Sequence, residues 1–529
     1  APNPYISACK LLTGIIMGVG FHKKKVPLLR SFVVFTINAV IVGVGLMPPI
    51  FIFMYAYEPG FAYATRAINA AVTIPVRVFT FYFLWKACGK MLTEMKERQQ
   101  NFTNKKKNKS SADFSAYANS FQAVTIPGLS RIKALLDALG NPENSLRFIH
   151  IAGTNGKGSV AADIASILTA AGYRVGKYTS PNLLRVNERI SVASEDIPDG
   201  ALDALLERIR PLADKIREEG GIPPTQFEIW TAAAFVYFKE ESCDYVVLEV
   251  GLGGEFDATN VIPQNEIAVI TRLGMDHMQY LGNTLSDIAR AKCGILKTDS
   301  ATHRLITPAQ EPEAMAVIRA ACEEKGIALT VPAPVSEGAE GYLERFSVGK
   351  YQHLLTGIPG YHQIENAALA VMACDALGIG EDAIRQGIAA AKNPARFEIL
   401  RENPTVIYDG GHNENGIRAL TASLDRYFPG EKKSVIFACM ADKATDVSLS
   451  LLSEGTEAFF FTEVKDNPRA LHAEDLAARA AALGISGTVC KNVGDAYEAA
   501  VAAGRLTVIC GSLYLYEDLM HYFEKTKKR

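Results

Sequence analysis

From about residue 114 onward, short apolar runs alternate with longer segments whose apolar positions repeat at helical spacing. The runs predict buried strands at 148–152, 245–250 and 267–271, and the intervening segments predict helices at 160–171, 201–218, 227–238 and 285–296. Strands that alternate with helices are typical of a doubly wound parallel α/β sheet. We therefore expect an α/β domain over residues 114–393.

A second series of the same kind begins near residue 394. Its apolar runs predict strands at 406–408, 434–439, 458–462 and 506–510, with a helix at 473–483 among the segments between them. The stretch from Asn393 to Ile399 contains the predicted hinge. The pattern predicts a second, Rossmann-like α/β domain over 394–529, with ligands bound where strands end at the domain cleft.

The N-terminal part of the chain follows a different pattern. Residues 31–57 carry no charge over a length sufficient to cross a bilayer, and 67–85 are apolar apart from Arg77. Basic residues precede the first stretch and follow the second, so the positive-inside rule predicts a helical hairpin with both ends in the cytoplasm. This assigns 1–95 to a hydrophobic helical segment, with membrane contact through 31–90, and 96–113 to a basic linker. An equal alternative is a foreign segment fused to an otherwise complete protein.

Composition narrows the function classes. The 529 residues exceed the size of one core, and 21% charged with 48% hydrophobic residues indicates a globular chain. A net charge of −2 and the lack of a basic stripe argue against nucleic acid as a partner. Nine scattered cysteines without a Cys-x-x-Cys pair indicate reduced thiols, and so cytoplasmic catalytic domains rather than a disulfide framework.

Residues 150–159, HIAGTNGKGS, join a predicted strand to a predicted helix. Three glycines allow a tight turn, the helix N-terminus directs backbone N–H groups into it, and Lys157 adds a cation. The turn predicts a polyphosphate site made of Gly153, Thr154, Asn155, Gly156, Lys157, Gly158 and Ser159. Its spacing departs from the usual pattern, because Gly158 stands between Lys157 and Ser159.

Three polar side chains lie at or just after other predicted strand ends. Ser180 offers a hydroxyl to a metal, although a Ser-Pro pair more often marks only a turn. Glu249 lies in an apolar strand, where a carboxylate needs a cation, a partner or a proton. His277 follows the next strand and is either a metal ligand or a packed histidine. Each of the three is therefore a candidate metal ligand, and for each the structural alternative stays open.

Further candidates lie on a helix and after a strand of the second series. Lys292 falls on the face that Ile288 and Ile295 would bury, so it needs an anion or a chemical change. Asp409 and His412 follow the strand at 406–408, where ligand contacts at a cleft are expected.

In this order, the motifs resemble those of the folylpolyglutamate synthase/dihydrofolate synthase family, a branch of the ATP-dependent Mur-type ligases. The resemblance covers about 114–529, and residues 1–110 resemble no family that we recognise. It rests on GTNGKGS at 153–159, TSPNLLRVNERI at 179–190, EVGLGGEFDATN at 249–260, DHMQYLGNT at 276–284, ARAKCGILK at 289–297, HQIENA at 362–367, ARFE at 395–398 and YDGGHN at 408–413.

The resemblance implies a Mur-ligase-like fold and a set of site roles. The cofactors it implies are ATP, held by the glycine turn, and Mg²⁺. Metal ligands would be Ser180, Glu249 and His277, and further ATP contacts Asn366, Arg396 and Asp409. Lys292 would be a carbamylated catalytic lysine beside Lys157, and His412 would act in the glutamate region. Thr225, Phe227 and Glu228 would lie near the pterin.

The activity implied is ATP-dependent addition of L-glutamate to dihydropteroate, a folate or both, through an acyl phosphate. The chain departs from the family at Asn182, Glu255, Ala291 and the stretch 411–414, and the acid at 255 would stand near a phosphate site. Two alternatives remain at this stage. One is a Mur-type ligase of cell-wall precursors, and the other is a membrane-tethered nucleotide-binding module without ligase activity.

Overall fold

The computed structural model describes residues 114–121, 128–298 and 302–527, which all belong to one compact unit of the chain. The hydrophobic segment at 1–95, with its predicted hairpin at 31–90, and the linker at 96–113 lie outside these residues. Within the described ranges, no helix is both long and apolar enough to cross a bilayer.

The first sheet has eight strands in the order β4-β3-β2-β5-β1-β6-β7-β8. Their bounds are β1 Phe148–Ala152, β2 Val175–Tyr178, β3 Ile190–Val192, β4 Glu195–Asp196, β5 Tyr245–Glu249, β6 Asn265–Ile270, β7 Thr302–Ile306 and β8 Ala328–Thr330. The predicted parallel sheet is confirmed for β2, β5, β1, β6, β7 and β8. The edge strands β3 and β4 pair antiparallel, because the two-residue turn Ala193-Ser194, with both φ angles positive, can form only a hairpin.

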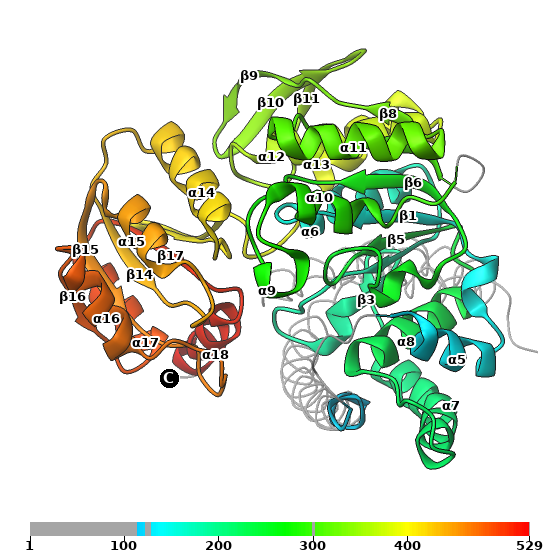
Figure 1. Ribbon diagram of the computed structural model, residues 1–529. Helices are drawn as coiled ribbons and strands as arrows, with labels where there is room; N and C mark the ends of the chain where they lie inside the picture. The colour runs from blue at the N-terminus through cyan, green and yellow to red at the C-terminus, as the bar shows by residue number, and fades with distance from the viewer. Residues whose placement is uncertain (1–113, 122–127, 299–301, 528–529) are drawn as a thin grey trace, which may run out of the picture. The chain divides into compact units, whose positions relative to one another are not determined.

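Helices cover both faces of this sheet, as the strand pattern requires (Figure 1). They are α5 Ser130–Ala138, α6 Lys157–Ala170, α7 Asp199–Glu218, α8 Gln226–Glu240, α9 Met278–Leu281, α10 Leu285–Cys293, α11 Pro312–Lys325, α12 Gln363–Ala376 and α13 Glu381–Ala390. Short 3₁₀ turns lie at η2 Pro142–Ser145, η3 Val186–Arg189 and η4 Ala258–Val261.

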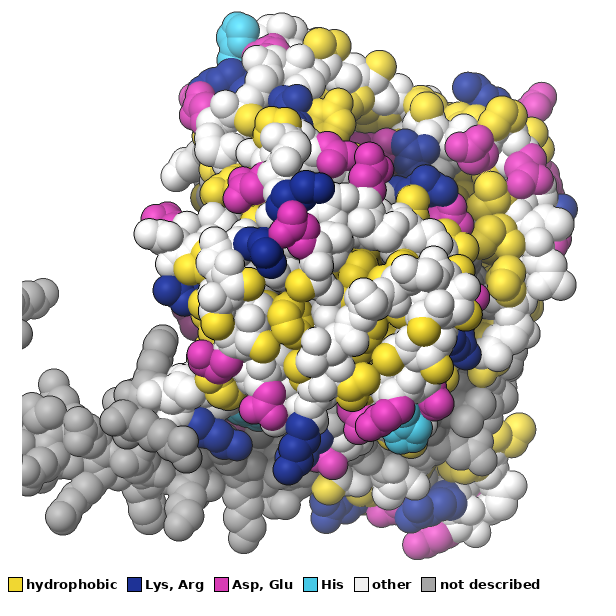
Figure 2. Space-filling view, turned by 90° about the vertical axis from the view of Figure 1, so that its left-hand side faces the viewer, with side chains coloured by type: hydrophobic (Ala, Val, Ile, Leu, Met, Phe, Trp, Pro, Cys, Tyr) yellow, Lys and Arg dark blue, Asp and Glu magenta, His cyan; other side chains and the backbone are white. Residues whose placement is uncertain are grey.

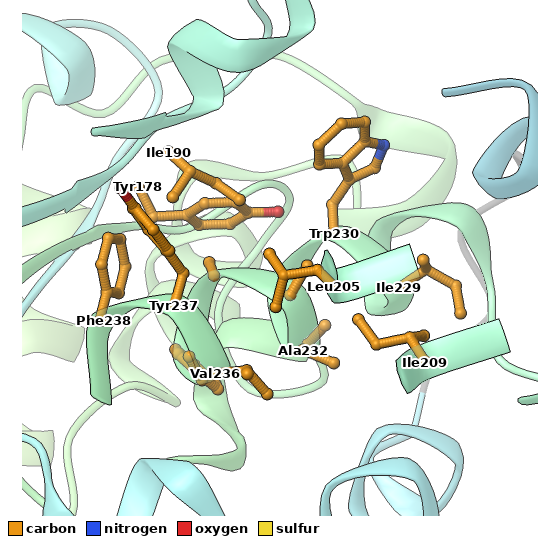
Figure 3. Packing of buried hydrophobic residues seen from close by; sticks show 14 of the residues in the cluster. Tyr178, Ile190, Leu205, Ile209, Ile229, Trp230, Ala232, Val236, Tyr237 and Phe238 are labelled. Atoms are coloured by element: carbon orange, nitrogen blue, oxygen red, sulfur yellow. The ribbon is translucent and has the colours of Figure 1, made fainter. Parts of the chain in front are cut away.

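Alternate side chains of β1 enter two different cores. Phe148 packs with α5, α7 and α8, whereas Ile149 and Ile151 pack with α6, α12 and α13. Figure 3 shows the first core, in which α8 side chains such as Trp230 lie beside Tyr178 of β2. Burial on both faces explains why the strand is apolar throughout rather than alternating.

A small antiparallel sheet, with strand order β11-β10-β9, was not predicted. It comprises β9 Val335–Glu340, β10 Leu343–Val348 and β11 Tyr351–Leu355. The sequence of β9, VSEGAE, is almost wholly exposed and contains no apolar run. Hydrophobic periodicity therefore gave no signal for it.

The second sheet has the order β12-β13-β17-β14-β15-β16. Its strands are β12 Glu398–Glu402, β13 Thr405–Tyr408, β14 Lys433–Phe437, β15 Thr456–Phe461, β16 Gly487–Val489 and β17 Leu506–Cys510, and its helices are α14 Glu414–Tyr427, α15 Thr445–Ser453, α16 Ala473–Ala482, α17 Val493–Ala502 and α18 Leu515–Lys527. All pairs except β12–β13 are parallel, which confirms the predicted second α/β series. On the face in Figure 2, basic and acidic side chains are interspersed rather than gathered by sign.

Strand register brings the candidate loops of the first sheet to one edge. Ile151 of β1 lies opposite Glu249 of β5, and Ala152 lies opposite Ile270 of β6. The glycine turn, the loop after Glu249 and the loop that leads to His277 therefore leave the sheet side by side.

Candidate active site

A cleft of about 640 Å³ is lined by side chains from both α/β regions. This volume is typical of a small-molecule site. Predicted residues among its lining are Gly153, Thr154, Asn155, Gly156, Lys157, Gly158, Ser159, Ser180, Glu249, His277, Lys292, Asn366, Arg396, Asp409 and His412. Thr225, Phe227 and Glu228 are not part of that lining.

The glycine turn presents the start of α6 to the cleft. Gly156 caps this helix with a φ of +90°, and a methyl group there would lie 2.3 Å from Asn366 Oδ1. The amides of Thr154 and Asn155 donate to the carbonyl of Arg272, so they are already paired. The N–H groups in the first turn of α6 have no acceptor within the helix and are the donors left for an anion.

Two lysine side chains meet at the carbonyl of Gly153. Lys292 Nζ donates to it at 2.9 Å and Lys157 Nζ at 3.2 Å. Burial, and then the charge of Lys157, lower the pKa of Lys292 to about 7. Near neutral pH, a large share of Lys292 is therefore an uncharged amine. α10 ends at Cys293 rather than at 296, because Gly294 caps it, and this places Lys292 in its last turn.

Glu249 is buried beside the turn, with 5% of its surface exposed. Its Oε2 accepts a hydrogen bond from the amide of Ser180 at 3.2 Å. Burial raises the pKa of Glu249, while the charges of Lys157 and Arg396 oppose that rise. The carboxyl thus lies among cations without a close ion-pair partner in the part of the chain that the structure describes, which suits a position beside a metal ion.

His277 lies in the loop between β6 and α9 and lines the same cleft. Its backbone is in the left-handed region, with φ +51°, and its amide donates to Asp276 Oδ1 at 2.9 Å. Burial lowers the pKa of His277, against the opposing charge of Asp276. Its imidazole is therefore neutral near pH 7, which is the form that binds metals.

The donor set fits Mg²⁺ only in company with a nucleotide. Mg²⁺ prefers oxygen ligands and usually binds through one or two carboxylates together with phosphates and water. Ser180 and Glu249 supply oxygens and His277 an imidazole, whereas nowhere in the described ranges do three or more His, Cys, Asp or Glu side chains gather as a metal cluster. The remaining ligands would have to be phosphate oxygens and water.

The second region contributes side chains at its strand ends. Asp409 accepts from the amides of Phe397 at 2.9 Å and Gly411 at 2.7 Å, so it shapes the loops on either side of β13. His412 Nδ1 lies 2.9 Å from the carbonyl of Gly410, which requires the proton on Nδ1. Burial and the charge of Lys443 lower the pKa of His412 to about 4, so its ring is neutral near pH 7.

Two of the residues expected near the pterin, Thr225 and Glu228, form hydrogen bonds at the start of α8. Thr225 Oγ1 accepts from the amide of Glu228, and Glu228 Oε2 accepts from the amide of Thr225, which is a capping box. Glu228 also pairs with Arg131 at 3.1 Å. Phe227 lies closer to the cleft lining, because a methyl group at Gly251 would lie 2.7 Å from its ring.

Sequence reasoning missed a charged contact across the cleft. Lys443 Nζ donates to Asp276 Oδ1 at 2.8 Å, and Asn413 Nδ2 donates to Asp276 Oδ2 at 3.2 Å and to Asn155 Oδ1 at 3.1 Å. The available signal was position, since Lys443 is in the loop after β14 at the carboxyl end of a parallel strand.

Comparisons with known proteins place the chain among glutamate-adding ligases. The "Mur ligase middle domain" matches residues 220–374, and the "Mur ligase, glutamate ligase domain" matches 395–513. The dihydrofolate synthase/folylpolyglutamate synthase of Bacillus subtilis is 39% identical over 365 residues, which cover 66% of this chain and 84% of the relative.

Solved structures agree. Mycobacterium tuberculosis folylpolyglutamate synthase, solved with ADP and AMPPCP, has a TM-score of 0.72 at 30% identity, covering 79% of this chain and 99% of that one. Escherichia coli FolC, solved with DHPP and ADP, has a TM-score of 0.69 at 31% identity, covering 79% and 98%.

Proposed function

The chain belongs to the folylpolyglutamate synthase/dihydrofolate synthase family of Mur-type ligases, and we propose which residues of its cleft carry that activity. The reaction is ATP-dependent addition of L-glutamate to dihydropteroate or a folate. The ligase part is proposed to comprise 114–393, with the phosphate loop, and 394–529. The observation that carries the proposal is the convergence of Lys157, Glu249 and Lys292 on one cleft with Arg396 and Asp409 of the second region.

ATP would lie along the turn at 153–159. Lys157 and the first-turn amides of α6 face the triphosphate, while Asn366, Arg396 and Asp409 contact the nucleotide from the other side of the cleft. Ser180, Glu249 and His277 would hold Mg²⁺, which offsets phosphate charge when bound. The carboxylate of dihydropteroate or folate is a poor electrophile. Transfer of the γ-phosphoryl group of ATP to this carboxylate would form an acyl phosphate and release ADP.

The amine of glutamate then attacks the acyl carbon, and phosphate leaves as the amide forms. We propose that uncharged Lys292 adds to CO₂ and loses a proton, so that a buried amine becomes an anionic carbamate. A cleft between two domains excludes water, which would otherwise hydrolyse the acyl phosphate. His412 would act in the glutamate region, and Phe227, with Thr225 and Glu228 behind it, on the acceptor side.

The test uses the full chain with ATP, Mg²⁺, L-glutamate and either dihydropteroate or tetrahydrofolate, and follows ADP release and product mass. Lys157→Ala and Glu249→Gln should each lower kcat/KM by about 100-fold or more, because each removes charge stabilisation. Lys350→Ala is the matched control, since that lysine is exposed and paired with Asp375 outside the cleft. Glutamate-independent ADP release, or activity only with a UDP-muramyl acceptor, would contradict the assignment.

The hairpin at 31–90 remains a prediction, as does a cytoplasmic position of the catalytic domains. Alkaline carbonate extraction of membranes from cells that express the full chain tests the hairpin. Protease digestion before and after cell lysis tests the position of the catalytic domains. Retention in the membrane pellet, with the ligase part digested only after cell lysis, is the expected result.

A further inference from the structure

A buried polar chain runs behind the cleft, through residues that the proposed chemistry does not use. His150 of β1 and Thr259 of η4 are fully buried, and Asp257 is 8% exposed. His150 Nε2 lies 2.9 Å from Thr259 Oγ1, which in turn lies 2.6 Å from Asp257 Oδ1. These residues belong to the motifs at 150–159 and 249–260.

The donor and acceptor roles of Asp257, Thr259 and His150 determine where their protons lie. Asp257 is an acceptor here, so the Thr259 hydroxyl donates to it and must accept from His150. His150 Nε2 therefore carries the proton, and Nδ1 has no hydrogen-bond partner among the described residues. Burial lowers the pKa of His150, and the charge of Lys297 adds to that effect, so the ring stays neutral.

The other end of the chain holds the loop that follows Glu249. Asp257 Oδ2 accepts from the amide of Leu252 at 2.8 Å, and the Gly251 amide also donates to this carboxylate. Gly251, Leu252 and Gly253 line the cleft. Asp257 thus holds the backbone of residues 251 and 252 through their amides. The same segment lines the cleft, which contains the proposed reacting groups.

Three elements meet on this loop, and each approaches a glycine too closely for any side chain. A methyl group would lie 2.7 Å from the ring of Phe227 at Gly251, 2.9 Å from Leu281 of α9 at Gly253, and 2.7 Å from the carbonyl of Ala291 of α10 at Gly254. Phe227 is on the proposed acceptor side, α9 follows His277, and α10 carries Lys292. The loop therefore sets how these three elements stand toward Glu249.

We propose that Asp257, Thr259 and His150 are positioning residues that hold loop 251–254 in the shape needed to bind the acceptor. This rests on the proposed function for the meaning of the acceptor side. The phosphate turn also has a support of its own, because the amides of Thr154 and Asn155 donate to the carbonyl of Arg272. Loss of the hydrogen bonds among Asp257, Thr259 and His150 should therefore weaken binding of dihydropteroate or folate and leave ATP binding nearly unchanged.

The test compares Thr259→Val, which has the same shape without the hydroxyl, with Thr259→Ser, which keeps it. We expect Thr259→Val to raise the KM for dihydropteroate about tenfold and the KM for ATP less than twofold, with Thr259→Ser close to wild type. His150→Leu and His150→Gln form a second pair, because the Gln amide can replace the Nε2 donor.

Hydrogen exchange gives a readout that does not need activity. In Thr259→Val and His150→Leu, amides of 250–257 should exchange at least tenfold faster, while those of 153–160 keep the wild-type rate. Equal loss of protection throughout the chain, a parallel rise of both KM values, or no change in 250–257 would each overturn the proposal. A wild-type chain that adds no glutamate would refute the proposed function, and the exchange comparison would still decide this one.

Discussion

Two of the polar contacts between the two α/β regions differ in character. The strand-side contact joins Glu344 of β10 to Arg426 and Tyr427 of α14. The cleft-side contact joins Asp276 to Lys443 and Asn413. Of these six residues, only Asp276 lines the cleft.

The strand-side contact is built as a packed core. Glu344 is fully buried and accepts from Arg426 Nη2 and from the hydroxyl of Tyr427, both at 2.7 Å. The ring of Tyr342 lies 5.6 Å from that of Phe428 and 5.7 Å from that of Tyr427. Aromatic packing and a fully paired carboxylate leave no polar atom of Glu344 for a ligand, so this contact serves to hold the regions together.

The cleft-side contact consists of hydrogen bonds among polar side chains. Asp276 is shared between Lys443 and Asn413, and Asn413 also reaches Asn155 in the phosphate turn. The comparison shows that the contact with the fully buried carboxylate lies away from the cleft lining, whereas the contact whose carboxylate lines the cleft is shared among polar side chains.

Glu344→Ala should give the largest effect and tests the first half of that comparison. It leaves Arg426 and Tyr427 without their shared acceptor, at a cost of about 3 kcal/mol in the free energy of unfolding. Urea unfolding followed by tryptophan fluorescence measures it. Glu340→Ala, which breaks the exposed pair with Arg345, is the control and should change stability by less than about 0.5 kcal/mol. Equal effects of both variants would contradict a packed role for Glu344.

Lys443→Met tests the second half. Removing the ammonium leaves the charge of Asp276 uncompensated beside His277, and we expect kcat/KM for glutamate to fall about 50-fold, in line with losses of single charged groups in active sites. The melting temperature should fall less than in Glu344→Ala. Lys465→Met, at an exposed lysine, is the control. A variant with full activity and the stability loss of Glu344→Ala would reverse the comparison.

The pH dependence of the cleft-side contact sharpens it further. Burial alone would raise the pKa of Asp276, but the charge and hydrogen bond of Lys443 hold it below its usual value of 3.8. A lowered carboxyl pKa stabilises the fold above pH 3.8, and the gain is lost as pH falls through the folded value. The stability difference between wild type and Lys443→Met should therefore be largest near pH 8, at about 1 kcal/mol, and shrink as pH falls through the pKa that burial gives Asp276 without the lysine, which lies above 3.8. A difference that grows as pH falls would exclude this pair as its source.

The smallest expected effect is on stability and concerns Asp163, which belongs to neither contact. Asp163 is buried in α6, and burial raises its pKa well above 3.8. Stability is then lost as pH rises above 3.8 toward the folded value, because the unfolded chain releases the proton more readily. Asp163→Asn should gain about 1 kcal/mol at pH 8 and less at pH 5. Asp203→Asn, at an exposed position, is the control, and a gain independent of pH would rule out ionisation as the cause.

Local pattern predicted those parts of the fold whose signal is local. The apolar runs gave β1 and β17 with the bounds seen in the structure, and the glycine turn was placed at the start of α6. Site residues at strand ends were found because parallel strands end at one edge. The contact between Asp276 and Lys443 joins positions 167 apart, and no spacing rule reports such a pair.

Other features escaped for reasons of packing. The capping box of Thr225 and Glu228 and the pair of Glu228 with Arg131 were not predicted, and the position of these residues near the pterin stays a prediction. The end of α10 was placed too late, because Ile295 and Leu296 continue the apolar pattern beyond the helix. They are buried after Gly294 has already ended it.

The crowding around the phosphate turn limits what mutagenesis can report there. Alanine at Gly153 would bring its methyl group within 1.8 Å of Thr271 Oγ1, and alanine at Gly156 would meet Asn366. At Gly158 the nearest atom would be 3.7 Å away. Inactive alanine variants at the first two positions would therefore record a collision inside the protein, and only the third can tell an experimenter how closely a bound nucleotide approaches the backbone.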